Sequence, residues 1–525
     1  MKPILTMDFE TDPFSHGHSV KPFACGLYNG KNCITVWSPD CAAKMMKVLE
    51  KLPPSIVYMH NGGKFDIFFC MPWLAADLKI INGRIVKGTL CGRHEFRDSF
   101  SILPMALKAM GGKKDIDIDK LHRSCRDLHR VEILEYLKQD CIGLHELVTA
   151  FWSEFGDYLT IGSAALAQLK RFHPFENSNK KFDESLRKDF YFGGRVQCFQ
   201  SGIIEQPFKI FDVRSMYPYV MANRRHPIST SYSLDTLIGK DTAFIVAEGE
   251  NLGAFPTRLK KGGIDFTGER GTYYASIHEW NYSLETSTFK PSKVLRTYNF
   301  DEWTCFEGFV SHYFNARLKA IAENDNIKKL FYKLILNSSY GKFAQNPENF
   351  RDYCITHNQQ LSNPWIAKHV YNHGEYTIWE KPTHAAYYNN VAVGASITGA
   401  ARGVLRQGLS HATDLIYCDT DSIICRDLSG VSFGESLGDW QLEASGNRLA
   451  IAGKKLYACF NGEFPDGLEI GSETCIKSAT KGARISPAEI VRVARGETVT
   501  YKRDAPSFKL DGSQKFITRR IRKTA

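Results

Sequence analysis

Four carboxylates and a phenol in the first 140 residues have spacings that suit metal chemistry. Asp8 and Glu10 lie two residues apart in a run that alternates apolar and polar residues, so a strand would project both carboxylates from one face. Tyr136 and Asp140 are four residues apart in a helix-like pattern and would share a face, and Asp66 follows a Gly-Gly turn. Like charges side by side are unfavourable unless a cation lies between them. These residues therefore predict a site where two divalent ions activate water for phosphodiester hydrolysis.

A second group of acids lies at the ends of apolar runs further along the chain. Asp419-Thr-Asp421 joins two such runs, where a purely structural hairpin would favour Asn-Gly or Asp-Gly. Asp212 ends another apolar run and precedes a turn. A turn sequence that departs from structural preference is typical of a functional site. The three acids predict a second pair of metal ions, which would bridge the phosphates of a nucleotide and lower the pKa of an attacking hydroxyl.

A basic stripe follows one face of a predicted helix between residues 327 and 343. Its members, at steps of four, four and three, are Lys329, Lys333, Asn337 and Tyr340. Two lysines four residues apart repel each other in isolation, but the arrangement becomes favourable against a polyphosphate. The stripe therefore predicts a surface that faces a nucleotide.

Each of these residues also has a simpler interpretation. A single acid is more often a turn residue, an N-cap or a solvated side chain, and a lysine pair is more often solvated surface. Two other functions remain open: a nuclease with an inactive polymerase half, and a non-catalytic nucleic-acid-binding protein, which the net charge of +10 and the 12% aromatic content would suit. A non-catalytic nucleic-acid-binding protein would not need the two acid groups, because they repel DNA unless metal ions offset their charge.

Composition and length bound the class of protein. The 525 residues are 43% hydrophobic and 24% charged, which indicates an ordinary globular chain of two to four domains. Fourteen cysteines without a CxxC pair or zinc spacing indicate reduced thiols. The chain reaches Asp8 too soon for a signal peptide and has no apolar run of about 18 residues, so we expect a cytosolic protein. The basic residues that gather in the tail are Lys515, Arg519, Arg520, Arg522 and Lys523.

The elements that must position these residues follow from periodicity. The first 150 residues alternate strand-like and helix-like segments and predict an α/β domain. A polar linker is expected over residues 171–187, and a loop-rich insert over 346–382. The other predicted elements are strands at 5–10, 55–60, 415–418 and 421–425, a strand ending at Asp212, and helices at 131–155, 311–343 (interrupted at 324–326) and 391–409.

These motifs together resemble a known family. The segments that carry the likeness are Asp8-Phe-Glu10-Thr11, His60-Asn61-Gly-Gly-Lys-Phe65-Asp66, Tyr136-Leu-Lys-Gln-Asp140, Tyr191-Phe-Gly193-Gly194, Asp212-Val213-Arg-Ser215-Met-Tyr217-Pro218, Lys333-Leu-Ile-Leu-Asn337-Ser-Ser-Tyr340-Gly341, Tyr417-Cys-Asp419-Thr-Asp421-Ser422 and Lys455-Leu-Tyr457. Over nearly its whole length the chain resembles family B DNA polymerases of the protein-primed branch, found in phages and linear plasmids. Within that branch it is most similar to the tectivirus polymerases.

The resemblance implies that the first acid group belongs to a 3′–5′ proofreading exonuclease. Its metal ligands would be Asp8, Glu10, Asp66 and Asp140. Tyr136 would orient the attacking water. The residues that would hold the frayed primer end are Thr11, Asn61 and Phe65. Either Lys113 or Lys114 would assist metal binding.

The second acid group would belong to the polymerase palm. Its metal ligands would be Asp212, Val213 and Asp421, with Asp419 as a catalytic residue beside the primer terminus. The incoming nucleotide would contact Ser215, Tyr217, Lys329, Lys333, Asn337 and Tyr340. Tyr217 would lie under the deoxyribose and exclude a 2′-hydroxyl. The DNA contacts would be Lys455 and Tyr457 at the primer terminus, and Tyr191, Gly193 and Gly194 in a linker between the two active sites.

The implied fold combines α/β and α+β parts: a ribonuclease H-like exonuclease domain, then a right-hand polymerase with two terminal-protein-region insertions. The expected boundaries are 1–185 for the exonuclease, 186–225 and 383–445 for the palm, 226–310 and 347–382 for the two insertions, 311–346 for the fingers and 446–525 for the thumb.

The implied function is a DNA-directed DNA polymerase with 3′–5′ exonuclease that replicates a linear viral or plasmid genome. Initiation would use a hydroxyl of a terminal protein as primer. Each active site would hold two Mg²⁺ ions, with Mn²⁺ as an alternative. The expected partners are template and primer DNA, deoxynucleotides, the terminal protein and a single-stranded-DNA-binding protein. The enzyme would act as a monomer in the host cytoplasm, without a membrane.

Overall fold

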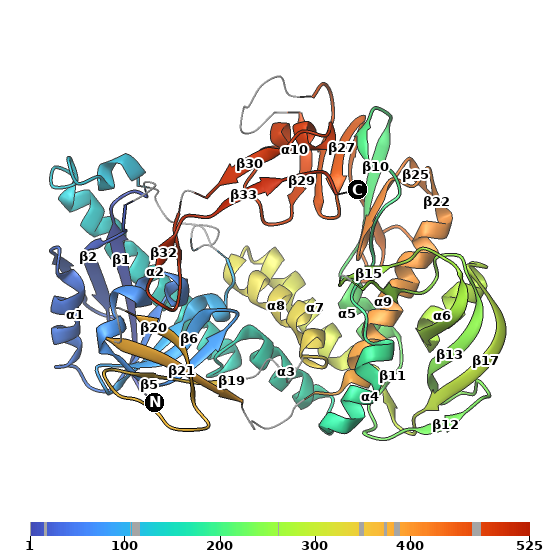
Figure 1. Ribbon diagram of the computed structural model, residues 1–525, viewed down its shortest axis with the longest axis horizontal. Coiled ribbons are helices and arrows are strands. Elements are labelled where there is room, and N and C mark those ends of the chain that lie inside the picture. Colours follow the sequence, from blue (N-terminus) through green and yellow to red (C-terminus); the bar gives the residue numbers. More distant parts are fainter. Residues whose placement is uncertain are drawn as a thin grey trace.

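The fold has an N-terminal unit and a second unit joined by helices. The computed structural model describes residues 2–14, 18–105, 107, 116–260, 262–345, 351–371, 375–382, 389–464, 474–503 and 505–524. Figure 1 shows the N-terminal unit at the left and the second unit at the right, with C-terminal strands that reach back over the top toward the N-terminal unit. The helices between the two units are α3 (Ile161–Phe172), α7 (Glu307–Ala322) and α8 (Asn326–Ser339).

The N-terminal unit is built on a ten-stranded sheet in the order β20-β21-β19-β5-β6-β7-β4-β1-β2-β3. Its first seven strands along the chain are β1 (Ile4–Thr11), β2 (Pro22–Tyr28), β3 (Cys33–Trp37), β4 (Ile56–Met59), β5 (Leu74–Ile81), β6 (Arg84–Leu90) and β7 (His94–Asp98). The pairs β1–β4 and β4–β7 are parallel, and the other neighbours are antiparallel. This confirms the α/β domain and the strands predicted at 5–10 and 55–60.

Helix α2 (Arg130–Phe155) packs against β1 and β2, as the apolar spacing of the sequence predicted. The residues it buries include Ile133, Leu137, Leu144, Leu147 and Phe151. The helix ends at Gly156, whose φ of 93° lies in a region that L-residues rarely adopt. The unit also contains α1 (Cys41–Leu49) and the single turns η1 (Gly62–Lys64), η2 (Asp66–Phe69), η3 (Met71–Trp73), η4 (Ser99–Ser101) and η6 (Ile118–Leu121).

The segment expected to be loop-rich is largely sheet. The strands β19 (Arg351–Thr356), β20 (Ile366–Tyr371) and β21 (Tyr376–Pro382) extend the N-terminal sheet, and β19 pairs with β5 about 275 residues earlier in the chain. The prediction of a loop-rich insert was therefore wrong for these residues. Strand β21 buries four consecutive residues from Tyr376 to Trp379, and Tyr376 and Ile378 belong to the N-terminal core.

The predicted polar linker over residues 171–187 also contains regular structure. Helix α4 (Lys180–Phe190) begins with Asn179, whose side chain accepts a hydrogen bond from the Phe182 N–H. The helix buries Phe182, Leu186 and Phe190 on one face. The linker prediction was wrong because the polar residues form the exposed face of an amphipathic helix.

The second unit centres on a five-stranded sheet in the order β26-β10-β24-β23-β8. Its strands are β8 (Val196–Cys198), β10 (Phe208–Val213), β23 (Tyr417–Asp419), β24 (Ser422–Cys425) and β26 (Trp440–Gly446). Helices α5 (Met216–Asn223) and α9 (Val391–His411) share a hydrophobic core with this sheet, and α9 is buried over most of its length. The predicted helix at 391–409 and the strand pair that follows it are confirmed.

A four-stranded antiparallel sheet flanks α9. Its order is β12-β17-β13-β16, and its members are β12 (Ser233–Asp235), β13 (Thr242–Asn251), β16 (Arg270–Ser276) and β17 (Phe289–Asn299), with α6 (Ile277–Glu285) between the last two in sequence. The short pairs elsewhere in this unit are β11 (His226–Pro227) with β18 (Trp303–Thr304), β14 (Thr257–Arg258) with β15 (Ile264–Asp265), and β22 (Ala412–Thr413) with β25 (Asp427–Leu428). Helix α8 is followed by the turn η7 (Tyr340–Lys342), and the break between α7 and α8 confirms the predicted interruption.

The C-terminal part forms a sheet in the order β29-β28-β27-β9, covered by α10 (Pro487–Ala494). The strands are β9 (Gly202–Ile204), β27 (Arg448–Gly453), β28 (Leu456–Phe460) and β29 (Cys475–Thr480). Two ribbons follow, β30 (Val499–Lys502) with β33 (Thr518–Ile521) and β31 (Ser507–Phe508) with β32 (Gln514–Lys515). The second ribbon reaches the N-terminal unit, where the Val20 N–H donates to Gln514 Oε1 at 2.7 Å. None of the helices in the described parts of the chain is both long and apolar enough to span a membrane.

Candidate active sites

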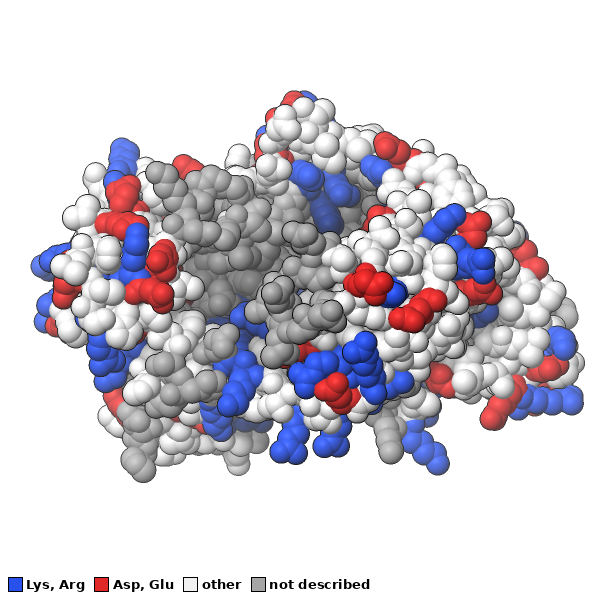
Figure 2. All heavy atoms as spheres, turned by 90° about the horizontal axis from the view of Figure 1, so that it is seen from above, with Lys and Arg blue, Asp and Glu red and all other residues white. Residues whose placement is uncertain are grey.

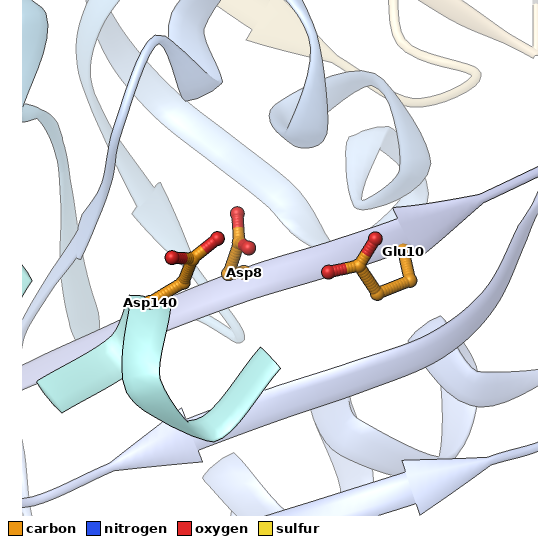
Figure 3. A group of neighbouring side chains, drawn as sticks. All are labelled: Asp8, Glu10 and Asp140. Atoms are coloured by element: carbon orange, nitrogen blue, oxygen red, sulfur yellow. The ribbon is translucent and has the colours of Figure 1, made fainter. Parts of the chain in front are cut away.

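Three carboxylates of the N-terminal unit converge. Asp8 and Glu10 project from β1 and Asp140 from α2, and one carboxylate oxygen of each lies within 4.8 Å of those of the other two (Figure 3). The helix is fixed against the strand by Thr6, whose hydroxyl donates to the Cys141 carbonyl at 2.6 Å. Glu10 and Asp140 are buried and Asp8 is half-buried. A buried set of hard oxygen donors with this spacing fits a divalent cation such as Mg²⁺ or Mn²⁺.

Asp66 lies outside this three-carboxylate group. It opens η2 and is buried, and burial raises the pKa of its carboxyl to about 7. Asp98 adds to this rise, whereas the backbone N–H of Phe9 favours the charged form. The predicted role of Asp66 as a metal ligand therefore stays a prediction. Tyr136 lies one helical turn before Asp140 on α2 and is half-buried.

An aromatic group surrounds Phe65, one of the residues predicted to hold the primer end. Its ring centroid lies 5.8 Å from that of Phe14, 5.5 Å from that of Phe69 and 5.1 Å from that of Phe508. Phe508 belongs to β31 and was not predicted, since nothing local in the sequence links residues 440 positions apart.

The other residues predicted to hold the primer end lie near this group along the chain. Thr11 ends β1 and is buried. Asn61 precedes η1 in the left-handed conformation, with a φ of 57°, and its side-chain oxygen accepts from Arg84 Nη2 at 3.0 Å. Lys113 and Lys114 lie outside the described residues.

The acids of the palm also meet in space. Strand β10 pairs with β24 so that Asp212 lies opposite Ser422, directly after the Asp-Thr-Asp turn. The Val213 N–H donates to the Asp421 carbonyl at 2.8 Å. Burial and then Asp421 raise the pKa of Asp212 to about 7. Burial and then Asp419 raise the pKa of Asp421. Buried carboxylates whose pKa values are raised by neighbouring carboxylates are well suited to a bound cation.

Asp419 has a different environment from its two neighbours. Lys455 Nζ lies 2.7 and 2.8 Å from its two carboxylate oxygens. Tyr417 connects the same two residues, because its hydroxyl donates to Asp419 Oδ2 at 3.3 Å and accepts from the Lys455 N–H at 3.0 Å. The ring of Tyr457 lies 4.9 Å from that of Tyr417. Lys455 therefore neutralises Asp419, whereas Asp212 and Asp421 face a pocket.

That pocket has a volume of about 640 Å³ and lies between the palm and the helices α7 and α8. The predicted residues that line it are Asp212, Val213, Ser215, Tyr217, Lys333, Asn337, Tyr340 and Asp421. Ser215 precedes α5 with a φ of 56°, which turns the chain so that Tyr217 can face the pocket. Lys329, also predicted to contact the nucleotide, is exposed on α8 and is not part of the lining.

Several residues of this site were not predicted from the sequence. Arg317 of α7 lines the pocket, and its Nε is buried with no hydrogen-bond partner among the described residues. Burial and then Arg214, another lining residue, lower the pKa of Arg317. Glu443 of β26 contributes to the raised pKa of Asp212 and forms an ion pair with Lys477. A lone arginine in a helix carries no local pattern, so only the fold could identify Arg317.

The linker that the resemblance implies at Tyr191, Gly193 and Gly194, distinct from the polar linker predicted at 171–187, lies directly against the Asp-Thr-Asp turn. It runs from Tyr191 to Arg195, between α4 and β8. A Cβ on Gly194 would lie 2.7 Å from the Thr420 hydroxyl oxygen, so only glycine allows this approach. The Thr420 N–H donates to the Arg195 carbonyl at 2.7 Å. Figure 2 shows lysine and arginine side chains at several places on this face, interspersed with aspartate and glutamate.

Comparisons with known proteins agree with this architecture. The family described as DNA polymerase type B, organellar and viral, matches residues 113–422. The DNA-directed DNA polymerase of Enterobacteria phage PRD1 is 45% identical over 99% of this chain and 98% of its own length. The DNA polymerase of Kluyveromyces lactis is 25% identical over 81% of this chain and 48% of its own.

Solved structures show a similar fold. Phi29 DNA polymerase complexed with primer-template DNA and incoming nucleotide substrates has a TM-score of 0.74 and 19% sequence identity, with all of both chains covered. The same polymerase complexed with single-stranded DNA has a TM-score of 0.76 and 19% identity, covering 99% of this chain and all of that one. At 19% sequence identity, these matches show a likeness of fold alone. The shared fold is consistent with an exonuclease-plus-polymerase architecture.

Proposed function

The chain belongs to the organellar and viral type B DNA polymerases and is a DNA-directed DNA polymerase of the phage type, and from this premise we propose that it also removes nucleotides from a DNA 3′ end at a second, separate active site. The observation that carries the proposal is the existence of two distant acid groups. Asp8, Glu10 and Asp140 converge in the N-terminal unit, and Asp212 and Asp421 line the palm pocket. Polymerisation alone needs only one of them.

At the palm, we propose that Asp212 and Asp421 hold Mg²⁺ and that the pocket holds the incoming deoxynucleotide. Bound divalent ions would lower the pKa of the primer hydroxyl and neutralise charge on the phosphates. Lys333 lines the same pocket and would face the triphosphate. The buried Nε–H of Arg317 has no hydrogen-bond partner among the described residues and suits the same anion. Tyr217 would lie beneath the sugar, where its ring excludes a 2′-hydroxyl by contact.

At the N-terminal site, we propose that the three converging carboxylates hold metal ions and that Tyr136 orients the attacking water. The buried environment of Glu10 and Asp140 supports this, because a desolvated carboxylate gains most from a bound cation. Thr11, Asn61 and Phe65 would hold the unpaired end. The linker from Tyr191 to Arg195, which contacts the palm turn, would guide the primer from one site to the other.

The exonuclease is tested with a primer that carries a mispaired 3′ nucleotide. Asp8→Ala should slow removal of that nucleotide at least roughly a hundredfold, because several kcal/mol of metal-ion catalysis are lost. Asp12→Ala is the matched control, since Asp12 lies just beyond β1 and pairs with Arg126 at 2.7 Å. Undiminished trimming in Asp8→Ala would refute the proposed site.

We further propose that synthesis starts from the hydroxyl of a terminal protein. The resemblance supports this, because it implies terminal-protein-region insertions at residues 226–310 and 347–382. The test is to incubate the enzyme with a labelled deoxynucleotide, Mg²⁺ and a candidate terminal protein. A covalent protein–nucleotide adduct that requires Asp421 is expected, and its absence with a terminal protein encoded beside the polymerase would contradict protein priming.

A further inference from the structure

A buried ion pair joins the insertion that contains α6 to helix α9 of the palm. Arg402 Nε donates to Glu279 Oε1 at 2.6 Å, and the two side chains are 2% and 4% exposed. The other carboxylate oxygen of Glu279 accepts from the Ser276 hydroxyl at 2.9 Å and the Ser276 N–H at 3.2 Å. A buried charge pair of this kind gains little net stability over apolar packing, but it fixes orientation. Glu279 therefore sets where the Arg402 guanidinium points.

A second nitrogen of the same guanidinium, Nη1, holds the linker. Arg402 Nη1 donates to the Phe192 carbonyl at 2.6 Å and to the Gly193 carbonyl at 2.9 Å. Helix α6 approaches α9 closely enough for this bridge only because Gly399 has no side chain, since a Cβ there would lie 2.2 Å from the Ser276 hydroxyl oxygen. Arg402 is thus clamped between the carboxylate on α6 and two consecutive backbone carbonyls of the linker.

The next two residues of the linker support the catalytic turn of the palm. Gly194 packs on Thr420, and Arg195 accepts the Thr420 N–H. Thr420 has a φ of 61°, which is costly for a β-branched residue, so surrounding contacts must hold it. Asp419 and Asp421 flank this residue. A continuous set of contacts therefore runs from Glu279 through Arg402 and the linker to the turn that carries the palm acids.

We infer that Glu279 is a positioning residue that biases the primer end toward the palm, an inference which rests on the proposed exonuclease function. Without the carboxylate, the buried Arg402 guanidinium has no anion and can rotate away from the linker carbonyls. The linker and the Thr420 turn would then loosen. The three carboxylates on β1 and α2 lie in the N-terminal unit, away from these contacts in the fold, so their own chemistry should not change. The balance between synthesis and degradation should shift toward degradation.

The test compares Glu279→Gln with the wild-type chain on one labelled primer–template. The quantity measured is the deoxynucleotide concentration at which net shortening gives way to net extension. It should rise roughly five- to tenfold in the variant, the size of a modest coupling between two sites. Shortening of single-stranded DNA, measured separately, should stay at the wild-type rate. A merely structural role would lower both activities together and leave this concentration unchanged.

Glu285→Gln is the matched control, because Glu285 lies on the same helix and is exposed, and it should behave as wild type. Glu279→Asp keeps the charge on a shorter side chain and should shift the balance in the same direction by less. If Glu279→Gln does not fold, the deoxynucleotide concentration measured for Glu279→Asp tests the inference by itself. An unchanged balance in the folded Glu279 variants would overturn the inference. A wild-type chain that does not shorten single-stranded DNA would instead refute the proposed exonuclease, and the inference with it.

Discussion

The rings of Tyr217 and Tyr340 stack face to face, with centroids 3.9 Å apart and an angle of 13° between their planes. Tyr217 comes from α5 of the palm, and Tyr340 directly follows α8. Both line the pocket of about 640 Å³ between the palm and the helices α7 and α8. The stack therefore connects the palm to the helix that carries Lys333, and it fixes the position of the ring that we propose lies beneath the sugar.

Replacing Tyr217 should weaken selection against ribonucleotides. Tyr217→Val removes the ring and opens space for a 2′-hydroxyl. Because the steric clash that excludes ribonucleotides is then lost, the preference for deoxynucleotides over ribonucleotides should fall at least about tenfold. Competitive incorporation of the two nucleotide types measures this ratio. Tyr219→Val changes the same helix outside the lining of this pocket and should leave the ratio unaltered. An unchanged preference in Tyr217→Val would place sugar selection elsewhere.

Arg317 and Lys329 should contribute unequally to nucleotide binding. Arg317 lines the pocket with a buried N–H that finds no partner in the part of the chain that the structure describes, whereas Lys329 is exposed and outside the lining. Loss of a hydrogen bond to a charged group costs about 1.5–3 kcal/mol, so Arg317→Ala should raise KM for deoxynucleotides about tenfold or more. Lys329→Ala should change it less than about twofold. Steady-state kinetics of primer extension measure KM for deoxynucleotides in both variants. A larger effect in Lys329→Ala than in Arg317→Ala would contradict this prediction and support the phosphate contact expected from the basic stripe.

The hairpin that carries Phe508 should be needed for efficient trimming. Phe508 is buried against Phe65, Phe68 and Phe69, with ring centroids between 5.1 and 5.8 Å apart. In Phe508→Ala, Phe65 loses a supporting neighbour. Because we propose that Phe65 holds the primer end, its displacement should slow trimming of single-stranded DNA about tenfold. Lys509→Ala alters an exposed residue of the same hairpin. Equal trimming rates in Phe508→Ala and Lys509→Ala would show that the contact has no role in the reaction.

Acid should destabilise the palm partly through His226. Its ring is fully buried, with Nδ1 2.9 Å from the Ser396 hydroxyl and Nε2 2.9 Å from the Val220 carbonyl. Burial lowers the pKa of this ring to about 3, below the roughly 6.5 of an unfolded histidine. Between these values the unfolded chain binds one more proton than the folded chain. One such group therefore costs about 1.4 kcal/mol of folding stability for each pH unit below 6.5.

The measurement is the midpoint of thermal unfolding at several pH values. The wild-type midpoint should fall more steeply between pH 6.5 and 4 than that of His226→Gln, because the variant lacks the titrating group. Carboxyls with raised pKa values, such as those of Asp66 and Asp212, are present in both chains, so their contributions to the pH dependence of the midpoint cancel in the comparison. His18→Gln removes an exposed histidine and should keep the wild-type slope. Parallel curves for wild type and His226→Gln would contradict the assignment.

The parts of the site that the sequence predicted are those whose geometry is local. Asp8 and Glu10 share a face because strand side chains alternate, and the Asp-Thr-Asp turn brings Asp419 and Asp421 together by itself. The spacing of Lys333, Asn337 and Tyr340 on α8 likewise follows from helix geometry. The likeness to the family, and the fold class that it implies, were inferred from motifs that contain these residues.

The residues that were missed depend on contacts between distant segments. Phe508 reaches Phe65 only because a C-terminal ribbon crosses to the N-terminal unit, and Arg317 reaches the pocket only because α7 packs beside α8. Strand β19 lies in the segment predicted to be loop-rich, because its partner β5 is about 275 residues earlier in the chain and no local pattern shows the pairing. No local pattern encodes these pairings, since the tertiary context decides them.

The central claim is that two separate acid groups perform two separate reactions, and Asp421→Asn tests it most directly. One preparation of this variant is assayed for primer extension and for shortening of single-stranded DNA. Extension should fall at least about a hundredfold, because the palm loses a proposed metal ligand, while shortening should proceed at the wild-type rate. Retained extension, or equal loss of both activities, would contradict the account.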